Sequence, residues 1–357
     1  MARRPLPLVL PTQGSLVEAL EQRTIAGELV ERGPGASLTC VACAHRCVLS
    51  ENKRGICGVR RHHAGELHVP WGYVARKYVR AVETNTVFHV RPGARALTFG
   101  LFGCDLHCPY CHNAALSQAL RDDLAGNPID ITPAALVDEA VSVRAEVICA
   151  AYNEPMIAAE WVHAVFLHAK RAGLVTALVS DGHSTPNALA YLRSVTDVYR
   201  VDLKGFSEAQ YRTLGGRLRP VLEAIREAKR LGYWVEVVTL VVPGLNDDAG
   251  GLCSLGDQLR GIDPAMPWHI NAFVPRYRLS ERPSPSAEFL VSVAGTAYAR
   301  GSRFVYVGNA PRAATLAHTR CPGCHELLIE RRDYATTRVA LQDRACSRCR
   351  APVPGLF

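Results

Sequence analysis

Three cysteines in one short loop are the residues of this sequence with the clearest chemistry. Cys104, Cys108 and Cys111 follow the spacing C-x3-C-x2-C. Thiolates this close can converge on one iron–sulfur cube, because sulfur is the soft ligand that such clusters select. A [4Fe–4S] cube has four irons, so three local thiolates leave one iron open, whereas a fourth thiolate would leave simple electron transfer. A zinc knuckle or scattered core cysteines are disfavoured, because the run from Leu97 to Phe99 predicts a strand that leads directly into the loop.

A second set of cysteines lies nearer the N-terminus, with the spacing C-x2-C-x3-C-x9-C over Cys40, Cys43, Cys47 and Cys57. Four thiolates fit a closed tetrahedral Zn²⁺ site, which favours a structural metal. A second iron–sulfur cluster is the alternative, because an auxiliary cluster could relay electrons. Zinc remains the preferred interpretation, since the set does not resemble the ferredoxin run that ends in Cys-Pro.

The third set contains Cys321, Cys324, Cys346 and Cys349. Two C-x2-C pairs about 20 residues apart are typical of a zinc ribbon, and rubredoxin-type iron binding is the chemical alternative. Between the pairs, residues 326–331 and 337–341 alternate enough to predict a small hairpin. Such a segment is too short to have its own core, so its folding should depend on the metal.

Composition sets the class of protein. The chain has 357 residues, 48% hydrophobic residues and a net charge of +8, so it can hold one large α/β domain with small appendages. The mild charge allows anionic partners without requiring them. Eleven of the thirteen cysteines fall into the three sets, which indicates metal binding in a reducing cytoplasm rather than disulfides. The two isolated cysteines, Cys149 and Cys253, are expected to be small buried hydrophobes. The apolar run 6–10 is too short for a signal peptide, and the sequence shows no membrane span.

The elements that must position the central loop alternate between strands and helices. Strands are predicted at 96–102, 146–152, 175–180, 198–203, 234–242, 268–273 and 304–307, and helices at 133–142, 158–171, 219–231 and 287–300. This order predicts right-handed crossovers and a parallel sheet. We expect a partial (βα)6 barrel over 94–309, an N-terminal extension with the first cysteine set over 1–93, and a ribbon-like domain over 310–357. A closed eight-stranded barrel is the alternative. Gly215-Gly216 and Gly250-Gly251 resemble turns rather than phosphate loops.

Polar residues follow the ends of the predicted strands, where parallel barrels build their sites. Asn153 and Glu154 follow the second strand, although this segment alone could be an ordinary turn. Asp202 and Lys204 end the fourth strand, and strand alternation places both side chains on one face. Taken in isolation, they could also be an exposed ion pair.

The central loop resembles the cluster-binding loop of the radical S-adenosylmethionine (SAM) superfamily, and Cys111-His112-Asn113 resembles the glycyl-radical-enzyme activases, such as those of pyruvate formate-lyase. Across most of the chain the resemblance is closest to the AmmeMemoRadiSam-type radical SAM proteins. It also rests on the block 40–60, on Tyr152–Pro155 and Asp202–Gly205, and on 242–247, 267–269, 305–309 and the final cysteine pairs.

The resemblance implies roles for individual residues. Cys104, Cys108 and Cys111 would hold the [4Fe–4S] cluster, and the residues expected to contact SAM or border the cluster are Tyr110, Asn113, Asn153, Glu154, Ser180, Asp181, Asp202, Lys204, Val242 and His269. Glu154 and groups near Asn153 would meet the methionine ammonium. Asp181 stands where the activases usually carry asparagine, so an amide donor is replaced by a carboxylate. His269 without the resemblance would be read as a core histidine.

The activity that the resemblance implies is one-electron reduction of SAM at the cluster, which breaks the C5′–S bond and yields a 5′-deoxyadenosyl radical that removes hydrogen from a substrate. A flavodoxin or ferredoxin would serve as the reductant. We favour a small-molecule substrate, because metal domains at both ends leave less open surface for a docking polypeptide. The alternatives are an activase that acts on a glycine of a partner protein, and a zinc-ribbon nucleic-acid-binding protein with an inactive barrel.

Overall fold

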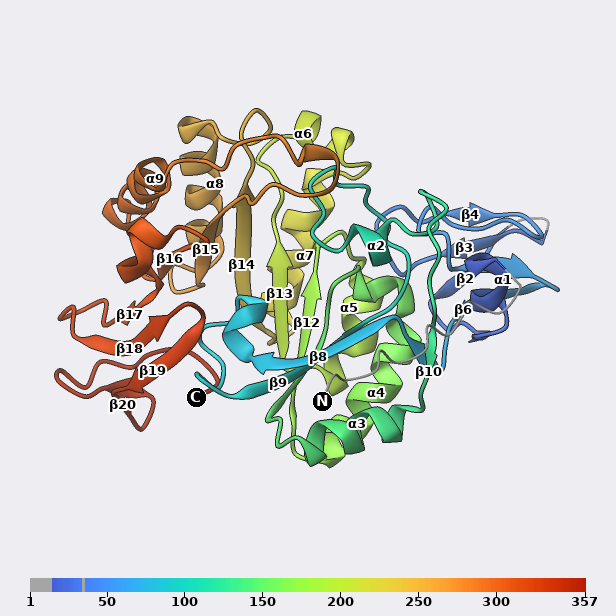
Figure 1. Ribbon diagram of the computed structural model, residues 1–357, viewed down its shortest axis with the longest axis horizontal. Helices are drawn as coiled ribbons and strands as arrows, with labels where there is room; N and C mark the ends of the chain where they lie inside the picture. The colour runs from blue at the N-terminus through green and yellow to red at the C-terminus, as the bar shows by residue number, and fades with distance from the viewer. Residues whose placement is uncertain (1–14, 34–35) are drawn as a thin grey trace, which may run out of the picture.

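The computed structural model of the protein describes residues 15–33 and 36–357 (Figure 1). The apolar run 6–10 lies outside these residues. Within the described chain, no helix is both long enough and apolar enough to span a membrane.

An eight-stranded sheet forms the barrel-like centre of the α/β fold (Figure 1). Its order is β16-β15-β14-β13-β12-β11-β9-β8, so β8 and β16 are its two edges. Its strands are β8 (Arg76–Ala81), β9 (Arg95–Gly100), β11 (Val147–Ala150), β12 (Val175–Ser180), β13 (Val198–Asp202), β14 (Trp234–Val241), β15 (Trp268–Ala272) and β16 (Val305–Gly308). All neighbouring pairs from β9 to β16 are parallel, as the alternating pattern predicts, and β8 pairs antiparallel with β9. The sheet therefore takes one strand from the N-terminal side of the predicted boundary at residue 93.

The longer helices cover the outer side of the sheet, and the short helices α2 (Ala114–Ser117) and α6 (Glu208–Thr213) lie near the carboxyl ends of its strands (Figure 1). The longer helices are α3 (Pro133–Ser142), α4 (Ala159–Arg171), α5 (Pro186–Leu192), α7 (Leu218–Arg230), α8 (Ala249–Ile262) and α9 (Ala287–Ala299). Thr132 and Thr185 cap α3 and α5 by accepting a hydrogen bond from the third helical N–H, and each is followed by proline at the first helical position. A threonine cap followed by proline thus begins both helices.

The prediction of a turn at Gly250-Gly251 is wrong, because both residues lie in the first turn of α8. Asp248 caps this helix, with its carboxylate accepting from the Gly251 N–H at 2.6 Å. Gly251 also packs against Phe206 so closely that a Cβ atom would lie 2.2 Å from a ring carbon. The glycine therefore serves close packing rather than a break in the helix. Gly215, by contrast, has a φ of +81° and does form the predicted turn.

The floor of the barrel is filled by the segment that connects β8 to β9, which includes the short 3₁₀ helix η1 (Val82–Asn85). Val82, Val87 and Val90 pack there against Cys149 and neighbouring small residues of the strands. Cys149 is fully buried, as predicted, whereas Cys253 on α8 is only half-buried. The floor thus closes the interior of the barrel at the end opposite to the carboxyl ends of the parallel strands.

The N-terminal module carries the first cysteine set beside α1 (Leu16–Glu21), which Ser15 caps. Its short strands are β1 (Thr24–Ala26), β2 (Val30–Arg32), β3 (Leu38–Cys40), β4 (Val48–Leu49), β5 (Arg61–His63) and β6 (Glu66–Pro70). β7 (Tyr73–Val74) pairs with β10 (Ile129–Asp130). A buried ion pair ties the module to the barrel, since both guanidinium nitrogens of Arg60 donate to Glu160 on α4 at 2.7 and 2.8 Å. Such a bidentate pair fixes orientation as well as contact.

The C-terminal ribbon lies on the other side of the barrel from the N-terminal module (Figure 1). It contains β17 (Thr319–Arg320), β18 (Leu327–Arg332), β19 (Ala335–Val339), β20 (Leu341–Gln342) and β21 (Ala345–Cys346), and β18 and β19 form the predicted hairpin. Its apolar residues Leu328 and Ile329 share one cluster with Phe88 and Tyr306 of the barrel. The ribbon thus obtains its core from the barrel.

Candidate active site

A cavity of about 530 Å³ opens at the carboxyl ends of the parallel strands. It brings together the predicted residues Cys104, Cys108, Tyr110, Cys111, Asn113, Asn153, Glu154, Asp181, Asp202 and Lys204. These residues come from the loop after β9 and from the ends of β11, β12 and β13, so the parallel register alone gathers them.

The cluster loop is held tightly against its surroundings. Gly103 has a φ of +90°, and a Cβ atom there would lie 2.7 Å from the carbonyl oxygen of Cys57, so the loop needs glycine at this position. Burial raises the pKa of Cys108 to about 12 and that of Cys104 well above its usual value. A bound metal would compensate the charge of the thiolates at these positions.

Glu154 and Asn153 occupy the loop after β11. The Asn153 side-chain NH₂ donates to the Gly103 carbonyl at 3.0 Å, and its Oδ1 accepts from Leu101 N at 3.0 Å, which fixes the start of the cluster loop. The Glu154 carboxylate accepts from the N–H groups of Met156 and Asp181 at 2.9 and 2.7 Å. The arrangement holds one carboxylate rigidly beside the cluster loop.

Buried carboxyl groups lie close together at this end of the cavity. Burial, and then the neighbouring carboxylates Asp181 and Asp105, raise the pKa of Glu154 well above its usual range. Burial and Asp105 likewise raise the pKa of Asp181 to about 7. Within the described chain, the buried Asp181 Oδ2 has no hydrogen-bond donor. This group of carboxylates is therefore suited to a cationic ligand.

Asp202 and Lys204 extend from the end of β13 on one face, as strand alternation predicts. Lys204 Nζ lies 3.5 Å from Asp202 Oδ2, and Arg200 Nη1 donates to Asp202 Oδ1 at 2.6 Å. Burial opposes the charge on Lys204, but Asp202 and then Cys108 raise its pKa well above the usual value. The side chain of Lys204 is only 16% exposed, so this is not the exposed ion pair of the alternative interpretation.

Three of the predicted residues lie outside the cavity lining. Ser180 is buried behind it and donates its hydroxyl to Glu154 at 3.0 Å. Val242 packs among apolar residues that back the cluster loop, including Leu106 and Phe273. His269 lies deeper in the barrel, where its Nε2–H donates to the buried Glu236 at 2.8 Å. Its contact is thus that of a core histidine, the interpretation favoured without the resemblance.

The structure adds residues that the sequence interpretation missed. Asn271 lines the cavity two residues after His269 on the same face of β15, so strand alternation could have selected it. Arg80 from β8 also faces the cavity, and so does Tyr334 from the ribbon, whose hydroxyl donates to Asn309 at 2.6 Å. Tyr334 had no local signal, because only the folding of the ribbon brings it to the barrel.

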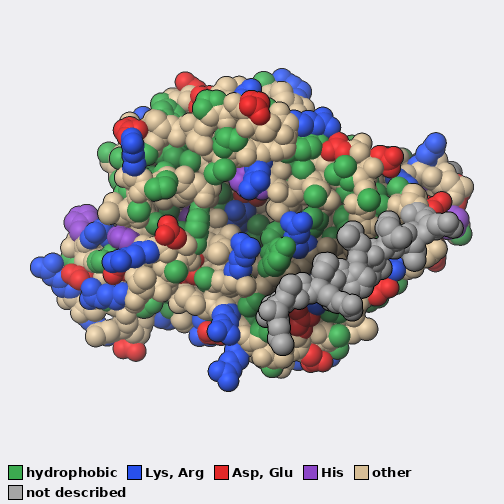
Figure 2. All heavy atoms as spheres, in the orientation of Figure 1, with side chains coloured by type: hydrophobic (Ala, Val, Ile, Leu, Met, Phe, Trp, Pro, Cys, Tyr) green, Lys and Arg blue, Asp and Glu red, His purple; other side chains and the backbone are tan. Residues whose placement is uncertain are grey.

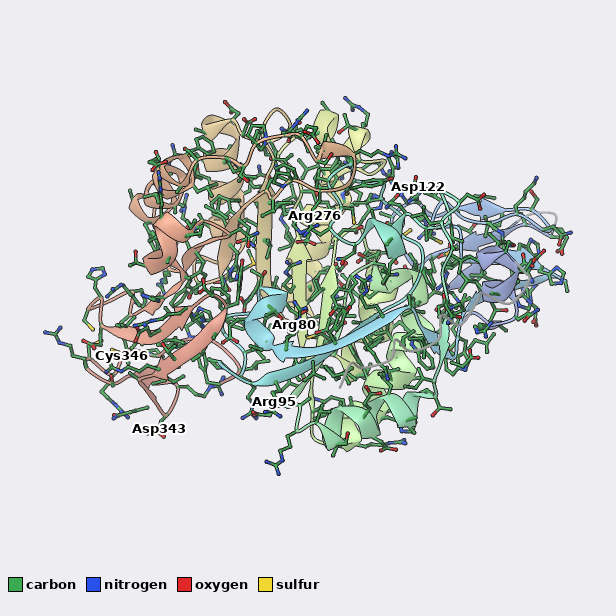
Figure 3. All side chains as sticks on the ribbon, in the orientation of Figure 1. Arg80, Arg95, Asp122, Arg276, Asp343 and Cys346 are labelled. Atoms are coloured by element: carbon green, nitrogen blue, oxygen red, sulfur yellow. The ribbon has the colours of Figure 1, made fainter. Side chains whose placement is uncertain are left out.

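Figures 2 and 3 show the surroundings of this cavity. In Figure 2, Lys and Arg side chains gather around a hollow near the centre of the face in view. Figure 3 labels Arg80 on β8 and Arg276 on the loop after β15, with Arg276 above Arg80 in this view. The rim therefore carries positive charge, in contrast to the carboxylates beside the cluster loop.

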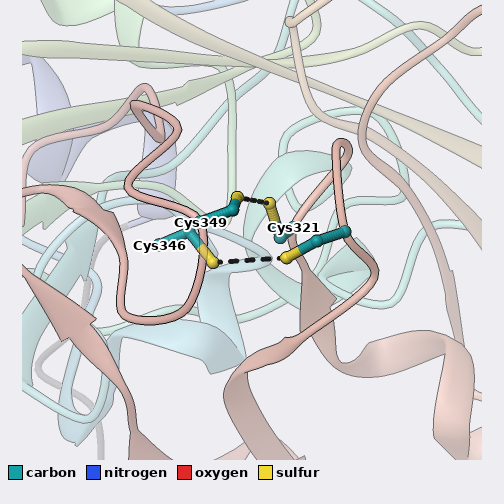
Figure 4. A group of neighbouring side chains, drawn as sticks. Cys321, Cys346 and Cys349 are labelled. Carbon is teal, nitrogen blue, oxygen red and sulfur yellow. Dashed lines mark hydrogen bonds between the residues drawn. The ribbon is translucent and has the colours of Figure 1, made fainter.

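The ribbon cysteines meet the geometry of a single-ion site. The Sγ atoms of Cys321 and Cys349 are 3.5 Å apart, and those of Cys324 and Cys346 are 3.6 Å apart (Figure 4). All four sulfurs lie within 4.8 Å of one another. A tetrahedral Zn²⁺ with Zn–S bonds of about 2.3 Å holds its sulfurs about 3.8 Å apart, so a metal ion fits here.

Comparison with known proteins agrees with this geometry. Residues 100–252 match the family model described as the radical SAM superfamily. The chain is 30% identical over 184 residues to the pyruvate formate-lyase 1-activating enzyme of Escherichia coli K12, covering 48% of this chain and 70% of that protein. It is 29% identical over 313 residues to MJ0808, an uncharacterized protein of Methanocaldococcus jannaschii, covering 87% of this chain and 92% of that protein.

Among solved structures, a radical SAM methyltransferase from Sphaerobacter thermophilus is similar, with a TM-score of 0.49 and 13% identity over 84% of this chain and 82% of that one. The α/β fold and the three-cysteine loop define the class, and the sequence matches agree with it. The chain belongs to the radical SAM superfamily and is a radical SAM enzyme. Membership implies SAM and a [4Fe–4S] cluster as cofactors.

Proposed function

We propose that the protein cleaves SAM reductively at a [4Fe–4S] cluster and uses the resulting 5′-deoxyadenosyl radical to remove hydrogen from a small molecule. The observation that carries this proposal is one cavity that contains both the three thiolates and the charged groups suited to SAM. The chemistry that the bound cluster and SAM supply is the one-electron cleavage of a C–S bond.

The cavity residues would divide the binding work. Cys104, Cys108 and Cys111 would hold the cluster. The carboxylate of Glu154 suits the SAM ammonium, because hydrogen bonds hold it rigidly beside the loop and its buried charge would be stabilised by a cation. Lys204 suits a carboxylate and Asp202 a ribose hydroxyl, since they reach the cavity from one strand end. The surrounding walls would exclude water from the radical.

The opposite part of the cavity supports a small, polar substrate with an anionic group. It carries the guanidinium group of Arg80 and the amide of Asn271. Its wall is completed by Tyr334 of the ribbon and Asn309 after β16. A wall made by the ribbon leaves less room for a docking polypeptide than an open strand edge would.

The experiment uses an extract of cells grown in heavy water and divided by ultrafiltration into protein and small-molecule fractions. Reduced, reconstituted protein is incubated in ordinary water with SAM and each fraction, and deuterium in 5′-deoxyadenosine is measured by mass spectrometry. We expect deuterium with the small-molecule fraction. Deuterium only with the protein fraction would favour the activase alternative. No SAM cleavage, together with salt-sensitive binding of RNA or DNA, would favour the nucleic-acid-binding alternative.

Replacing Lys204 with alanine should weaken SAM binding by about tenfold to a hundredfold, because a charge-assisted hydrogen bond of about 1.5–3 kcal/mol is lost. The cluster ligands are untouched, so iron content and absorbance should stay normal. Isothermal titration of SAM into the anaerobic variant measures the effect. The matched control is Lys170→Ala, which removes an exposed pair with Asp197 on the outer side of the barrel. An unchanged dissociation constant in Lys204→Ala would remove this lysine from the site.

A further inference from the structure

We propose that Cys40, Cys43, Cys47 and Cys57 bind a second [4Fe–4S] cluster, closed by four thiolates and adjacent to the SAM-cleaving one. The sequence alone favours zinc at this set. Two features of the structure favour iron instead: the sulfurs of this set are not gathered as in a single-ion site, and the set lies against the cluster loop.

The separation of the sulfurs distinguishes the three cysteine sets. In the ribbon, all four sulfurs lie within 4.8 Å of one another, as one ion requires. Among the described residues, neither the N-terminal set nor the cluster loop contains three sulfurs that meet this limit. A cube binds each cysteine through a different iron, so its ligands stand farther apart than ligands of one ion. The N-terminal set is therefore like the cluster loop, and unlike the ribbon, in that its sulfurs are not gathered at the distances of a single-ion site.

The four cysteines nevertheless lie in neighbouring segments of the N-terminal module. The backbone N–H of Cys40 donates to the Cys47 carbonyl at 3.0 Å, and Cys43 opens the turn that leads to Cys47. Ile56, beside Cys57, directs its N–H to Cys47 Sγ at 3.5 Å. Cys40, Cys43 and Cys57 are all buried, with at most 8% exposure. Hydrogen bonds to sulfur and burial are features that tune the potential of an iron–sulfur cluster.

The set also lies directly against the cluster loop. One guanidinium nitrogen of Arg121 donates to the carbonyls of Ile56 and Cys104 at 2.9 and 2.8 Å. Arg121 thus connects the residue before Cys57 to the first cysteine of the cluster loop. Gly103, as described above, packs on the Cys57 carbonyl.

A second connection runs through histidines. His45 in the Cys43–Cys47 turn bonds through Nε2 to the Asp105 carbonyl at 3.1 Å. Its ring lies 4.7 Å from that of His183, which contacts the Asp105 carboxylate at 3.2 Å. A purely structural zinc would not need to lie near the cluster loop. A redox cluster would, because electron transfer between two clusters requires that they lie close together.

The test separates the two clusters by mutation. Wild-type protein reconstituted anaerobically should contain about eight irons and eight sulfides per chain, because each cube holds four of each. The triple variant Cys104→Ala/Cys108→Ala/Cys111→Ala should keep half of both, with the Mössbauer spectrum of a [4Fe–4S] cluster. SAM should leave the EPR signal of this remaining cluster unchanged, because four thiolates leave no open iron. Adding Cys43→Ala to the triple variant should remove the remaining iron.

The triple variant leaves the N-terminal set intact, so its iron content decides the matter even where the Cys43→Ala protein fails to fold. A triple variant without iron but with two zinc ions per chain would overturn the proposal. Cys253→Ala serves as the control for cysteine replacement as such. The proposed function has its own readout, since SAM cleavage by the wild type is measured separately from the iron of the triple variant.

Discussion

Replacing Cys108 with alanine should abolish SAM cleavage: we expect reduced wild-type protein to form 5′-deoxyadenosine and methionine, and the variant to form neither. The reason is the number of thiolates in the cluster loop. Only Cys104 and Cys111 would remain, and two local ligands do not hold a cube that must leave one iron free. Cys108 is buried, with 7% exposure, so solvent does not readily replace its sulfur. Chromatography of both products after anaerobic reduction measures the effect.

Cys253→Ala is the matched control for this experiment, since Cys253 lies on α8 and belongs to none of the three sets. It should cleave SAM as the wild type does. Equal yields from Cys108→Ala and wild type would refute the assignment of the loop as the SAM-cleaving site.

Replacing Arg331 with methionine should lower the free energy of unfolding by about 3–5 kcal/mol, because a buried charge network would lose one member. Arg331 of the ribbon is 1% exposed. Its guanidinium donates to Phe88 O at 2.6 Å and to Thr319 Oγ1 at 2.8 Å, and lies 4.2 Å from the Phe88 ring centroid. Methionine fills the space but leaves these acceptors, and the buried carboxylate of Glu83, without their cation. Denaturant unfolding of the two proteins, prepared with the same metal content, measures the loss.

Arg332→Met provides a control at the neighbouring position. Arg332 points outward with 78% of its side chain exposed and makes only a surface pair with Glu330. Its replacement should change stability little. Equal stability of the two variants would show that the ribbon does not support the barrel through Arg331.

The sequence could predict the features that depend on local pattern. Strand alternation predicts that Asp202 and Lys204 share one face, and the spacing of Cys104, Cys108 and Cys111 marks the cluster loop. In the structure all five residues line one cavity. The resemblance placed His269 at the cavity, although residues alternate into the barrel at several depths. His269 lies one layer too deep, beside Glu236, and Asn271 takes the position at the cavity.

Other features could not be read from local pattern. Glycine has a low helix propensity, so Gly250 and Gly251 indicated a turn. In the structure both lie in α8, and the Phe206 ring packs so closely on Gly251 that this position of the helix cannot carry a side chain. Tyr334 and Arg80 come from segments on either side of the predicted core, and their meeting at the cavity depends on tertiary packing. The choice between zinc and iron at the first cysteine set depends on how closely its sulfurs gather in the fold, which spacing in the sequence does not determine.

The floor of the barrel has a consequence for how the chain folds. The strands β9 to β16 pair with their neighbours along the sequence, so each contact needs only a modest loop to close. The floor is different: His89 Nδ1–H donates to the Pro354 carbonyl at 2.7 Å across 265 residues, and Val90 pairs with Leu356. Pairings this distant close slowly, because a long loop must be ordered before the contact stabilises it. During synthesis, the strands of the barrel can therefore pair before its floor is complete, because the floor contacts with Pro354 and Leu356 form only after the ribbon has left the ribosome.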